Sequence, residues 1–77
     1  MDDLLKNINK IHTTPLGIIR LKKNLNLKMD DILKWCKNKI KNADNIIKKG
    51  KNWYAYIGSI VITINARSYT IITAHKI

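Results

Sequence analysis

The hydrophobic period of the chain changes near residue 44, and no other feature of the sequence constrains the fold as strongly. Up to residue 43, apolar residues recur every three or four positions, as they do along one side of a helix. From residue 45 onward they tend to alternate with polar residues, which is typical of half-buried strands. A helical half (1–43) followed by a strand half (44–77) predicts one α+β domain. We expect two to three helices on one face of a three- to four-stranded antiparallel meander.

The helical half contains three amphipathic segments, at residues 2–12, 13–25 and 30–40. The second contains Thr14, a favoured N-cap, and Pro15, which suits the first helical position. Gly17 is expected to weaken this helix. Most of the acids stand where helices should begin, near the positive end of the helix dipole: Asp2, Asp3, Asp30 and Asp31. The first segment places its apolar residues on one stripe: Leu4, Leu5, Ile8 and Ile11.

The dipeptide Gly58-Ser59 fits a two-residue hairpin turn, with glycine first. Residues opposite one another in an antiparallel pair point to the same side, so this turn assigns both faces of the hairpin. One face is apolar and should receive the helices: Trp53, Ala55, Ile57, Ile60, Ile62 and Ile64. The other face collects Tyr54, Tyr56, Val61, Thr63 and Asn65. Residues 46–49 are expected to add a short first strand.

The length of the turn before the last strand decides which side that strand's residues show. A three-residue turn, 66–68, places Tyr69, Thr73 and His75 beside Tyr54 and Tyr56. The residues between them then join the core: Thr70, Ile72 and Ala74. A turn of two or four residues would reverse this and bury a Tyr, a Thr and a His, each of which needs polar partners. We therefore expect the three-residue turn.

Fifteen Lys and Arg against five acids give a formal charge of +10, which favours a polyanionic partner such as RNA. Composition alone offers another explanation, because the chain is rich in Lys, Asn and Ile and has no Glu, Gln or Phe. The chain shows no secretory segment or membrane span, which predicts a cytoplasmic protein. Its single cysteine, Cys36, excludes an internal disulfide and a thiolate zinc cluster, and is expected to be buried. We expect no metal and no cofactor, since no nucleotide-binding or metal-binding motif is present.

Metal-independent RNA cleavage remains possible for a basic chain without metal-binding or nucleotide-binding motifs. It requires a general base, an acid and a cation beside the phosphate. The candidate catalytic residues are His75, Lys51, Thr73 and Tyr69. The candidate nucleic-acid-binding residues are Tyr54, Tyr56, Asn52, Asn65, Arg67, Ser68 and Lys49. His12 is either a second proton carrier or a structural residue.

Four segments, IHTTPLG, LKWCKNKI, KKGKNWY and INARSYTIITAHKI, resemble a family of short, uncharacterised bacterial proteins known only as a domain of unknown function. The helix-then-sheet order and the closing SYTIITAH are also similar to the barnase, colicin and RelE-type endoribonuclease toxins. That second resemblance implies cleavage through His75 and Thr73, with Lys51 as the cation, and an acidic antitoxin as partner. Because the chain lacks the many arginines of RelE toxins, it does not predict action on ribosomes.

Three functions follow as hypotheses. The first is a toxin-like endoribonuclease that acts on single-stranded RNA. The second is a nucleic-acid-binding module without catalysis. The third is a protein-interaction or inhibitor module that docks an acidic partner. Whether the protein is an enzyme stays open at this stage.

Overall fold

The computed structural model describes residues 3–28 and 31–77, and within them the helical segments precede the strands, as predicted. The elements are α1 (Asp3–Lys6), the 3₁₀ helix η1 (Ile8–Lys10), α2 (Pro15–Leu25), α3 (Ile32–Lys41), β1 (Asn45–Lys49), β2 (Asn52–Ile57), β3 (Ile60–Asn65) and β4 (Ile71–Lys76). The four strands form one antiparallel meander in the order β1-β2-β3-β4. The chain is therefore an α+β domain.

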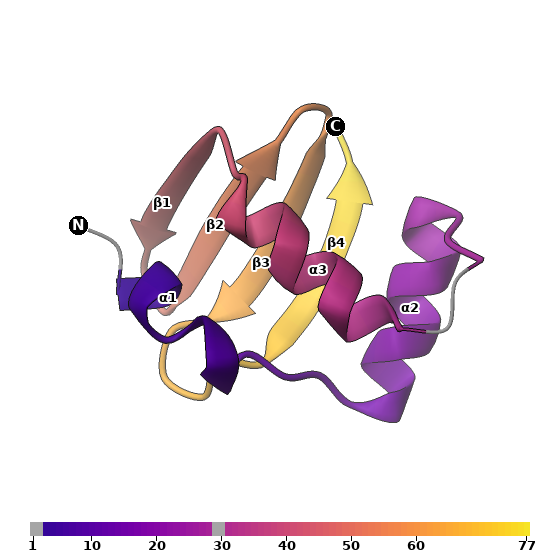
Figure 1. Cartoon of the computed structure of the whole chain (residues 1–77), viewed down its shortest axis with the longest axis horizontal. Helices are drawn as coiled ribbons and strands as arrows, with labels where there is room; N and C mark the ends of the chain where they lie inside the picture. Colours follow the sequence, from indigo (N-terminus) through magenta and orange to yellow (C-terminus); the bar gives the residue numbers. More distant parts are fainter. Residues whose placement is uncertain (1–2, 29–30) are drawn as a thin grey trace.

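The helices lie on one side and at one edge of the sheet (Figure 1). α1 and α3 lie in front of the strands in this view, and α2 runs beside β4. No helix of residues 3–28 or 31–77 lies behind the sheet. We call the side under α1 and α3 the covered face, and the opposite side the open face.

Two helices begin at capping side chains. The Thr14 hydroxyl accepts a hydrogen bond from the Gly17 amide at 3.0 Å, and Pro15 is the first residue of α2, as predicted. The Asp31 carboxylate accepts from the Lys34 amide at 3.0 Å, which caps α3. Such caps satisfy amides that have no partner inside the helix. The predictions for Asp2 and Asp30 lie outside the described residues.

The first helix is shorter than its apolar stripe predicts. The Asn7 amide donates to the Leu4 carbonyl (3.3 Å) and the Lys10 amide donates to the Asn7 carbonyl (2.8 Å), so the segment tightens into i→i+3 turns. A turn of three residues rotates the stripe relative to a 3.6-residue helix. As a result Leu4 is fully buried, whereas Leu5 is 39% exposed.

Gly17 fills a steric role that the sequence alone did not reveal. A Cβ at this position would overlap the Thr13 hydroxyl oxygen. The Thr13 hydroxyl in turn donates to the Ile71 carbonyl at 3.4 Å. Glycine therefore allows the first turn of α2 to lie close against the segment that meets β4.

The covered face holds the core. Trp53 pairs with Ile64 and Ala55 pairs with Ile62, in the predicted register. Gly58 has a φ of +57°, as the first position of the predicted hairpin turn requires. The largest fully buried side chains come from the sheet, from α1 to α3 and from the segment before α2: Leu4, Ile11, Leu21, Ile32, Cys36, Ile40, Ile62, Ile64 and Ile71.

The turn into β4 is longer than predicted. Four residues, 66–69, separate Asn65 from Thr70: the Asn65 amide donates to the Thr70 carbonyl and the Tyr69 amide donates to the Asn65 carbonyl, both at 2.9 Å. This even number places Tyr69 on the covered side, against Trp53. The prediction that Tyr69 lies on the open face is therefore wrong, as is the prediction that Thr70 joins the core.

A β-bulge then restores the predicted faces for the rest of β4. Thr63 pairs with Thr73, one residue later than the turn alone would give. Ile72 has no partner opposite and is 40% exposed, so its predicted place in the core is also wrong. Beyond the bulge, Thr73 and His75 lie on the open face, and Ala74 is fully buried, as predicted. An inserted residue of this kind shifts every later side chain by one face.

Candidate nucleic-acid interface

The open face is built from three cross-strand rows. The first joins Tyr56, Val61 and His75, the second joins Tyr54, Thr63 and Thr73, and the third joins Asn52 to Asn65. Val61 and Thr63 lie in the middle of their rows and are 6% and 7% exposed, although neither belongs to the core cluster. Their neighbours on β2, Tyr56 and Tyr54, are therefore the residues that a ligand stacked on this face would meet.

The two tyrosines of the open face border a hollow of about 580 Å³. Tyr54 and Tyr56 are both half-buried, so part of each ring remains available. Ile47, which pairs with Tyr54 across β1 and β2, is 43% exposed. Lys49 and Gly50 complete the lining of the hollow. An aromatic surface beside an ammonium group suits a nucleobase next to its phosphate.

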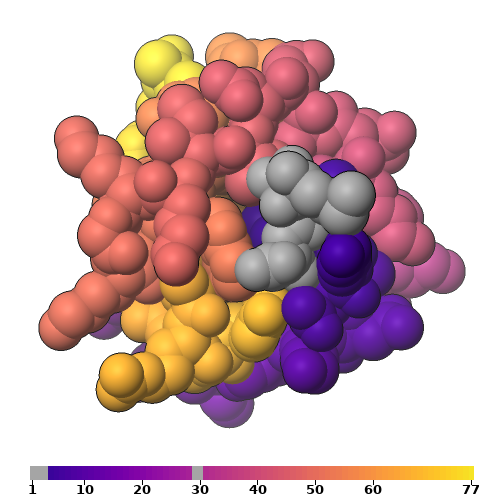
Figure 2. All heavy atoms as spheres, turned by 90° about the vertical axis from the view of Figure 1, so that its left-hand side faces the viewer, coloured from indigo at the N-terminus to yellow at the C-terminus, as the bar shows by residue number. Residues whose placement is uncertain are grey.

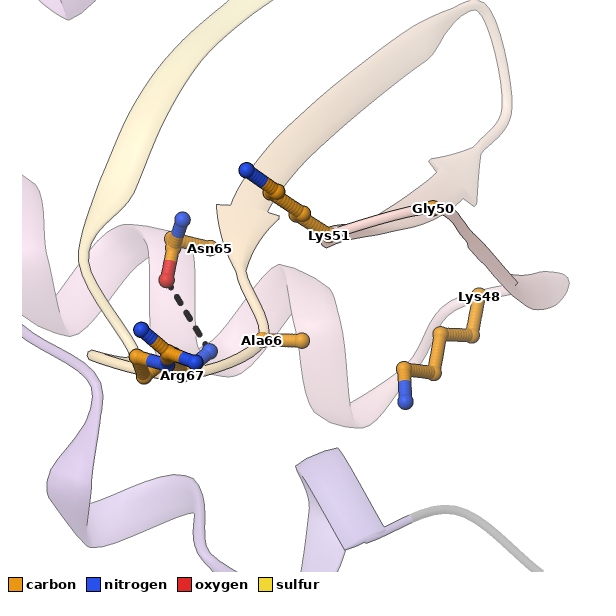
Figure 3. Close-up of a pocket in the computed structure, with 6 residues that line it drawn as sticks. All are labelled: Lys48, Gly50, Lys51, Asn65, Ala66 and Arg67. Carbon is orange, nitrogen blue, oxygen red and sulfur yellow. Dashed lines mark hydrogen bonds between the residues drawn. The ribbon is translucent and has the colours of Figure 1, made fainter.

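A second hollow, of about 550 Å³, lies between the β1–β2 turn and the β3–β4 turn. The Ala66 amide donates to the Lys51 carbonyl at 2.8 Å, which holds the two turns together. Figure 2 shows both turns at one corner of the molecule, in salmon and amber, with the N-terminal segment beside the second. In Figure 3 the side chains of Lys48 and Lys51 diverge, that of Lys51 running upward and that of Lys48 downward. The cations therefore surround this corner, which we call the turn end, and do not converge on one point.

Two of the described acids, Asp31 and Asp44, have their carboxylates in hydrogen bonds away from the turn end. Asp31 caps α3, and the Asp44 carboxylate accepts from the Gly58 amide at 2.8 Å, at the opposite end of β2 and β3. The turn end instead presents exposed Lys48, Lys51 and Arg67. A surface with one sign of charge attracts polyanions.

Four side chains form a continuous hydrogen-bond chain at the turn end. Asn65 Oδ1 accepts from the amides of Arg67 and Ser68, both at 2.9 Å, and from the Ser68 hydroxyl at 3.2 Å. Ser68 Oγ lies 2.8 Å from Thr70 Oγ1, which lies 2.9 Å from His12 Nε2. We call this series, from His12 through Thr70 and Ser68 to Asn65, the His12 chain.

The backbone places His12 beside β4. The His12 amide donates to the Tyr69 carbonyl (3.0 Å), and the Ile71 amide donates to the His12 carbonyl (2.8 Å), which makes a parallel bridge to Thr70. The His12 ring is fixed at its other nitrogen, since Nδ1 lies 2.9 Å from the Lys10 carbonyl oxygen. Sequence reasoning left the role of His12 open because its contact with Thr70 spans 58 residues and no local pattern signals it.

The predicted catalytic residues do not meet. Thr73 and His75 share the open face, but His75 pairs with Val61, four residues along β3 from Asn65 at the turn end. At about 3.3 Å per residue, that separation is ~13 Å along the strand, and Lys51 lies at the turn end. His75 and Lys51 therefore do not face a single phosphate.

Tyr69, the fourth predicted catalytic residue, takes part in the core instead. Its ring centroid lies 5.3 Å from that of Trp53, with the rings tilted by 44°. The ammonium of Lys10 lies 5.8 Å from the Tyr69 ring centroid. The backbone of Tyr69 is left-handed, with φ of +58°, which is uncommon for a bulky residue. Tyr69 therefore anchors the turn between Trp53 and Lys10.

Cys36 is not a candidate nucleophile. Its side chain is fully buried under α3, and this burial raises the pKa of the thiol from 9.0 to about 12. The thiolate, which is the reactive form, is therefore suppressed at neutral pH. Within residues 3–28 and 31–77, no group of three His, Cys, Asp or Glu side chains is placed to hold a metal ion. None of the helices described is long and apolar enough to cross a membrane.

Residues 5–75 match the family described as protein of unknown function DUF3781. The chain belongs to this family. The match covers almost the whole chain and confirms the expected membership of an uncharacterised family. The family description carries no activity, ligand or residue role, and no curated protein and no solved structure matches the chain.

Proposed function

We propose that this DUF3781 protein binds single-stranded RNA in the cytoplasm, with bases stacked on the open face and phosphates held at the turn end. Tyr54 and Tyr56 are the stacking residues. Lys49, Lys51 and Arg67 supply the cations, and Asn52 and Asn65 supply hydrogen bonds between the two regions. The observation that carries the proposal is that α1 and α3 lie on the other side of the sheet from Tyr54 and Tyr56, and that exposed Lys48, Lys51 and Arg67 line the hollow at the adjoining turn end.

Single-stranded nucleic acid suits this surface better than a duplex does. Unpaired bases stack on aromatic rings for about 1–3 kcal/mol each, whereas bases inside a duplex already stack on one another. The half-buried state of Tyr54 and Tyr56 means that the rings are already held by the sheet, so little side-chain freedom is lost on binding. The spread of cations along two turns fits an extended phosphate backbone rather than a single anion.

Fluorescence anisotropy with a labelled, 2′-O-methylated single-stranded RNA tests the proposal. Replacing Tyr54 or Tyr56 with Ala should weaken binding by roughly 5- to 150-fold, the equivalent of ~1–3 kcal/mol. Lys51→Glu and Arg67→Glu should also flatten the salt dependence, since each phosphate contact contributes about −0.7 to the slope for single strands. Lys41→Glu is the matched charge reversal, because Lys41 is exposed in the last turn of α3, the helix on the covered face. Equal losses for Lys41→Glu and Lys51→Glu would contradict a localised site.

A second candidate function, docking of an acidic, antitoxin-like protein, is favoured by one observation on α2. Leu16 and Ile19 are 69% and 61% exposed on the outer side of this helix. Arg20 and Lys23 are also exposed there, so apolar contact and positive charge occur together. An amphipathic acidic segment is the partner that this combination would suit.

Affinity capture separates the two candidates. Leu16→Glu combined with Ile19→Glu should abolish recovery of an acidic protein from the host and leave RNA binding unchanged. If this double variant loses RNA binding while Tyr54→Ala keeps it, the open face is not the RNA site.

A further inference from the structure

In the His12 chain, the imidazole of His12 is oriented as a general base would be. The Lys10 carbonyl oxygen only accepts hydrogen bonds, so the Nδ1 atom of His12 carries the hydrogen in their 2.9 Å contact. In neutral His12 the Nε2 atom is then an unprotonated acceptor, and the Thr70 hydroxyl 2.9 Å away donates to it. A base oriented by a third group and joined to a hydroxyl is the arrangement found in general-base and nucleophilic catalysis.

The hydrogen bonds of the His12 chain can also form when His12 is protonated. With Nε2 protonated, His12 donates to Thr70, Thr70 donates to Ser68 and Ser68 donates to Asn65 Oδ1. Every donor in this reversed order still has an acceptor. The His12 chain can therefore accept a proton at Nε2 and keep all of its hydrogen bonds.

The surroundings of the chain suit an anionic substrate. His12 and Ser68 are exposed, and Thr70 is half-buried. The Arg67 amide binds Asn65 within the same turn, so its exposed side chain starts beside the chain. Lys10, whose carbonyl orients His12, places its ammonium 5.8 Å from the Tyr69 ring centroid, next to Thr70 in sequence. Cations in this position would stabilise a phosphate group that gains negative charge.

We propose that His12 is the general base of a metal-independent RNA cleavage site at the turn end, an inference that rests on RNA binding at the open face. A ribose 2′-OH replaces the Thr70 hydroxyl on Nε2, and the Thr70 hydroxyl rotates to donate to a phosphate oxygen. Nε2 takes the 2′-OH proton as the 2′-oxygen bonds to phosphorus. The bond from phosphorus to the 5′-oxygen breaks, and that oxygen takes a proton from water. The products are a 2′,3′-cyclic phosphate and a 5′-OH end, and His12 returns its proton to solvent.

This site differs from the one that the sequence favoured. His75 is exposed on β4, five residues from Thr70, which corresponds to ~16 Å along an extended strand. His75 also lies at the same end of the sheet as the Asp44 carboxylate and the β2–β3 turn. The backbones of Lys10 and Arg67 contact members of the His12 chain, whereas the Asp44 carboxylate lies at the end of the sheet where His75 lies.

The test follows cleavage of a labelled, mixed-sequence single-stranded RNA in chelator-containing buffer by wild type, His12→Gln and His75→Gln. Glutamine keeps a hydrogen-bonding group at position 12 but cannot take the proton. General-base catalysis contributes about 10²- to 10⁴-fold, so His12→Gln should cleave at least ~100-fold more slowly. His75→Gln should stay close to wild type, and phosphatase-resistant cyclic ends should mark the product. Binding of the 2′-O-methylated RNA, which cannot be cleaved by this route, is measured in parallel, and thermal melts check that each variant is folded.

The outcomes separate this inference from the proposed function. Wild type that binds the 2′-O-methylated RNA but leaves the unmodified RNA intact would overturn the cleavage site and leave RNA binding standing. Equal cleavage by wild type and His12→Gln would also overturn it, as would loss of cleavage in His75→Gln alone. Absence of binding to both RNAs would overturn the proposed function and this inference together. Should His12→Gln fail to fold, Thr70→Val replaces it, with the same expected loss in rate and the same retained binding.

Discussion

Tyr69 and Tyr54 are both tyrosines of the strand half, yet they lie on opposite faces of the sheet. Tyr69 packs on Trp53 at 5.3 Å and closes the core over the β3–β4 turn. Tyr54 pairs with Thr63 on the open face and lines a hollow beside Lys49. The covered face packs the core under the helices, and the open face is where we propose that RNA binds. Residue type does not decide between these two uses; the register of the strand does.

The largest expected effect concerns how well the covered face excludes water, which the alkylation rate of Cys36 measures. Because the pKa of this buried thiol is raised to about 12, its thiolate fraction at pH 8 should be about 1000-fold below that of an ordinary thiol of pKa 9.0. Alkylation by iodoacetamide should therefore be slower than in the guanidinium-unfolded chain by at least that factor. The same shift means that this thiol's contribution to stability is complete below pH 9 and is lost between pH 9 and 12. Alkylation of the native protein at the unfolded rate would show that the layer under α3 is open to water.

A cavity in the covered face should be the next largest effect. Ile62→Ala removes a side chain that is 0% exposed in the centre of the sheet and should lower the free energy of unfolding by about 2–5 kcal/mol. Val61→Ala is the matched change one residue away on the open face, and it should cost less because Val61 lies outside the core cluster. Urea denaturation measures both. Equal losses would show that the open face is packed as tightly as the core.

Truncation of an open-face tyrosine should show the opposite pattern. Tyr54→Ala should weaken RNA binding by ~1–3 kcal/mol, whereas Tyr69→Leu should change affinity little and lower stability through the lost contact with Trp53. Anisotropy titration measures the RNA affinity of both variants, and urea denaturation measures their stability. If Tyr69→Leu loses affinity and Tyr54→Ala keeps it, stacking on the open face does not contribute to binding.

The smallest effect concerns the turn that assigns the two faces. Gly58→Ala should destabilise the protein by about 1–2 kcal/mol, because Gly58 has a left-handed φ of +57° that an L-residue with a Cβ resists. Ser59→Ala is the matched control in the same turn and should change the melting temperature much less. A neutral Gly58→Ala would mean that the β2–β3 register does not depend on this turn.

The sequence was sufficient for the parts of the fold that local rules determine. Alternation and one glycine turn predicted the pairing of Trp53 with Ile64. The N-cap Thr14 followed from its position before Pro15, and Asp31 was predicted at a helix start. The last strand was harder because an even turn and a bulge at Ile72 cancel in their effect on parity. Thr73 and His75 were therefore placed correctly by reasoning that assumed the wrong turn length, while Tyr69, inside that turn, was not.

The candidate site was predictable only in part, for a different reason. Tyr54 and Tyr56 belong to a single strand, so their common face follows from alternation. The His12 chain joins residues 58 positions apart through a parallel bridge that no periodicity announces. A site formed where the N-terminal segment meets the edge of the sheet requires the tertiary structure.

NMR of the aromatic rings tests the central claim, that RNA binds on the open face, most directly. The protein is labelled with ¹³C in Tyr and Trp and titrated with 2′-O-methylated single-stranded RNA. The ring resonances of Tyr54 and Tyr56 should move progressively as bases stack on them, while those of Trp35, half-buried on α3, stay in place. Shifts confined to Trp35, or a titration in which the Tyr54 and Tyr56 rings do not move, would contradict the account.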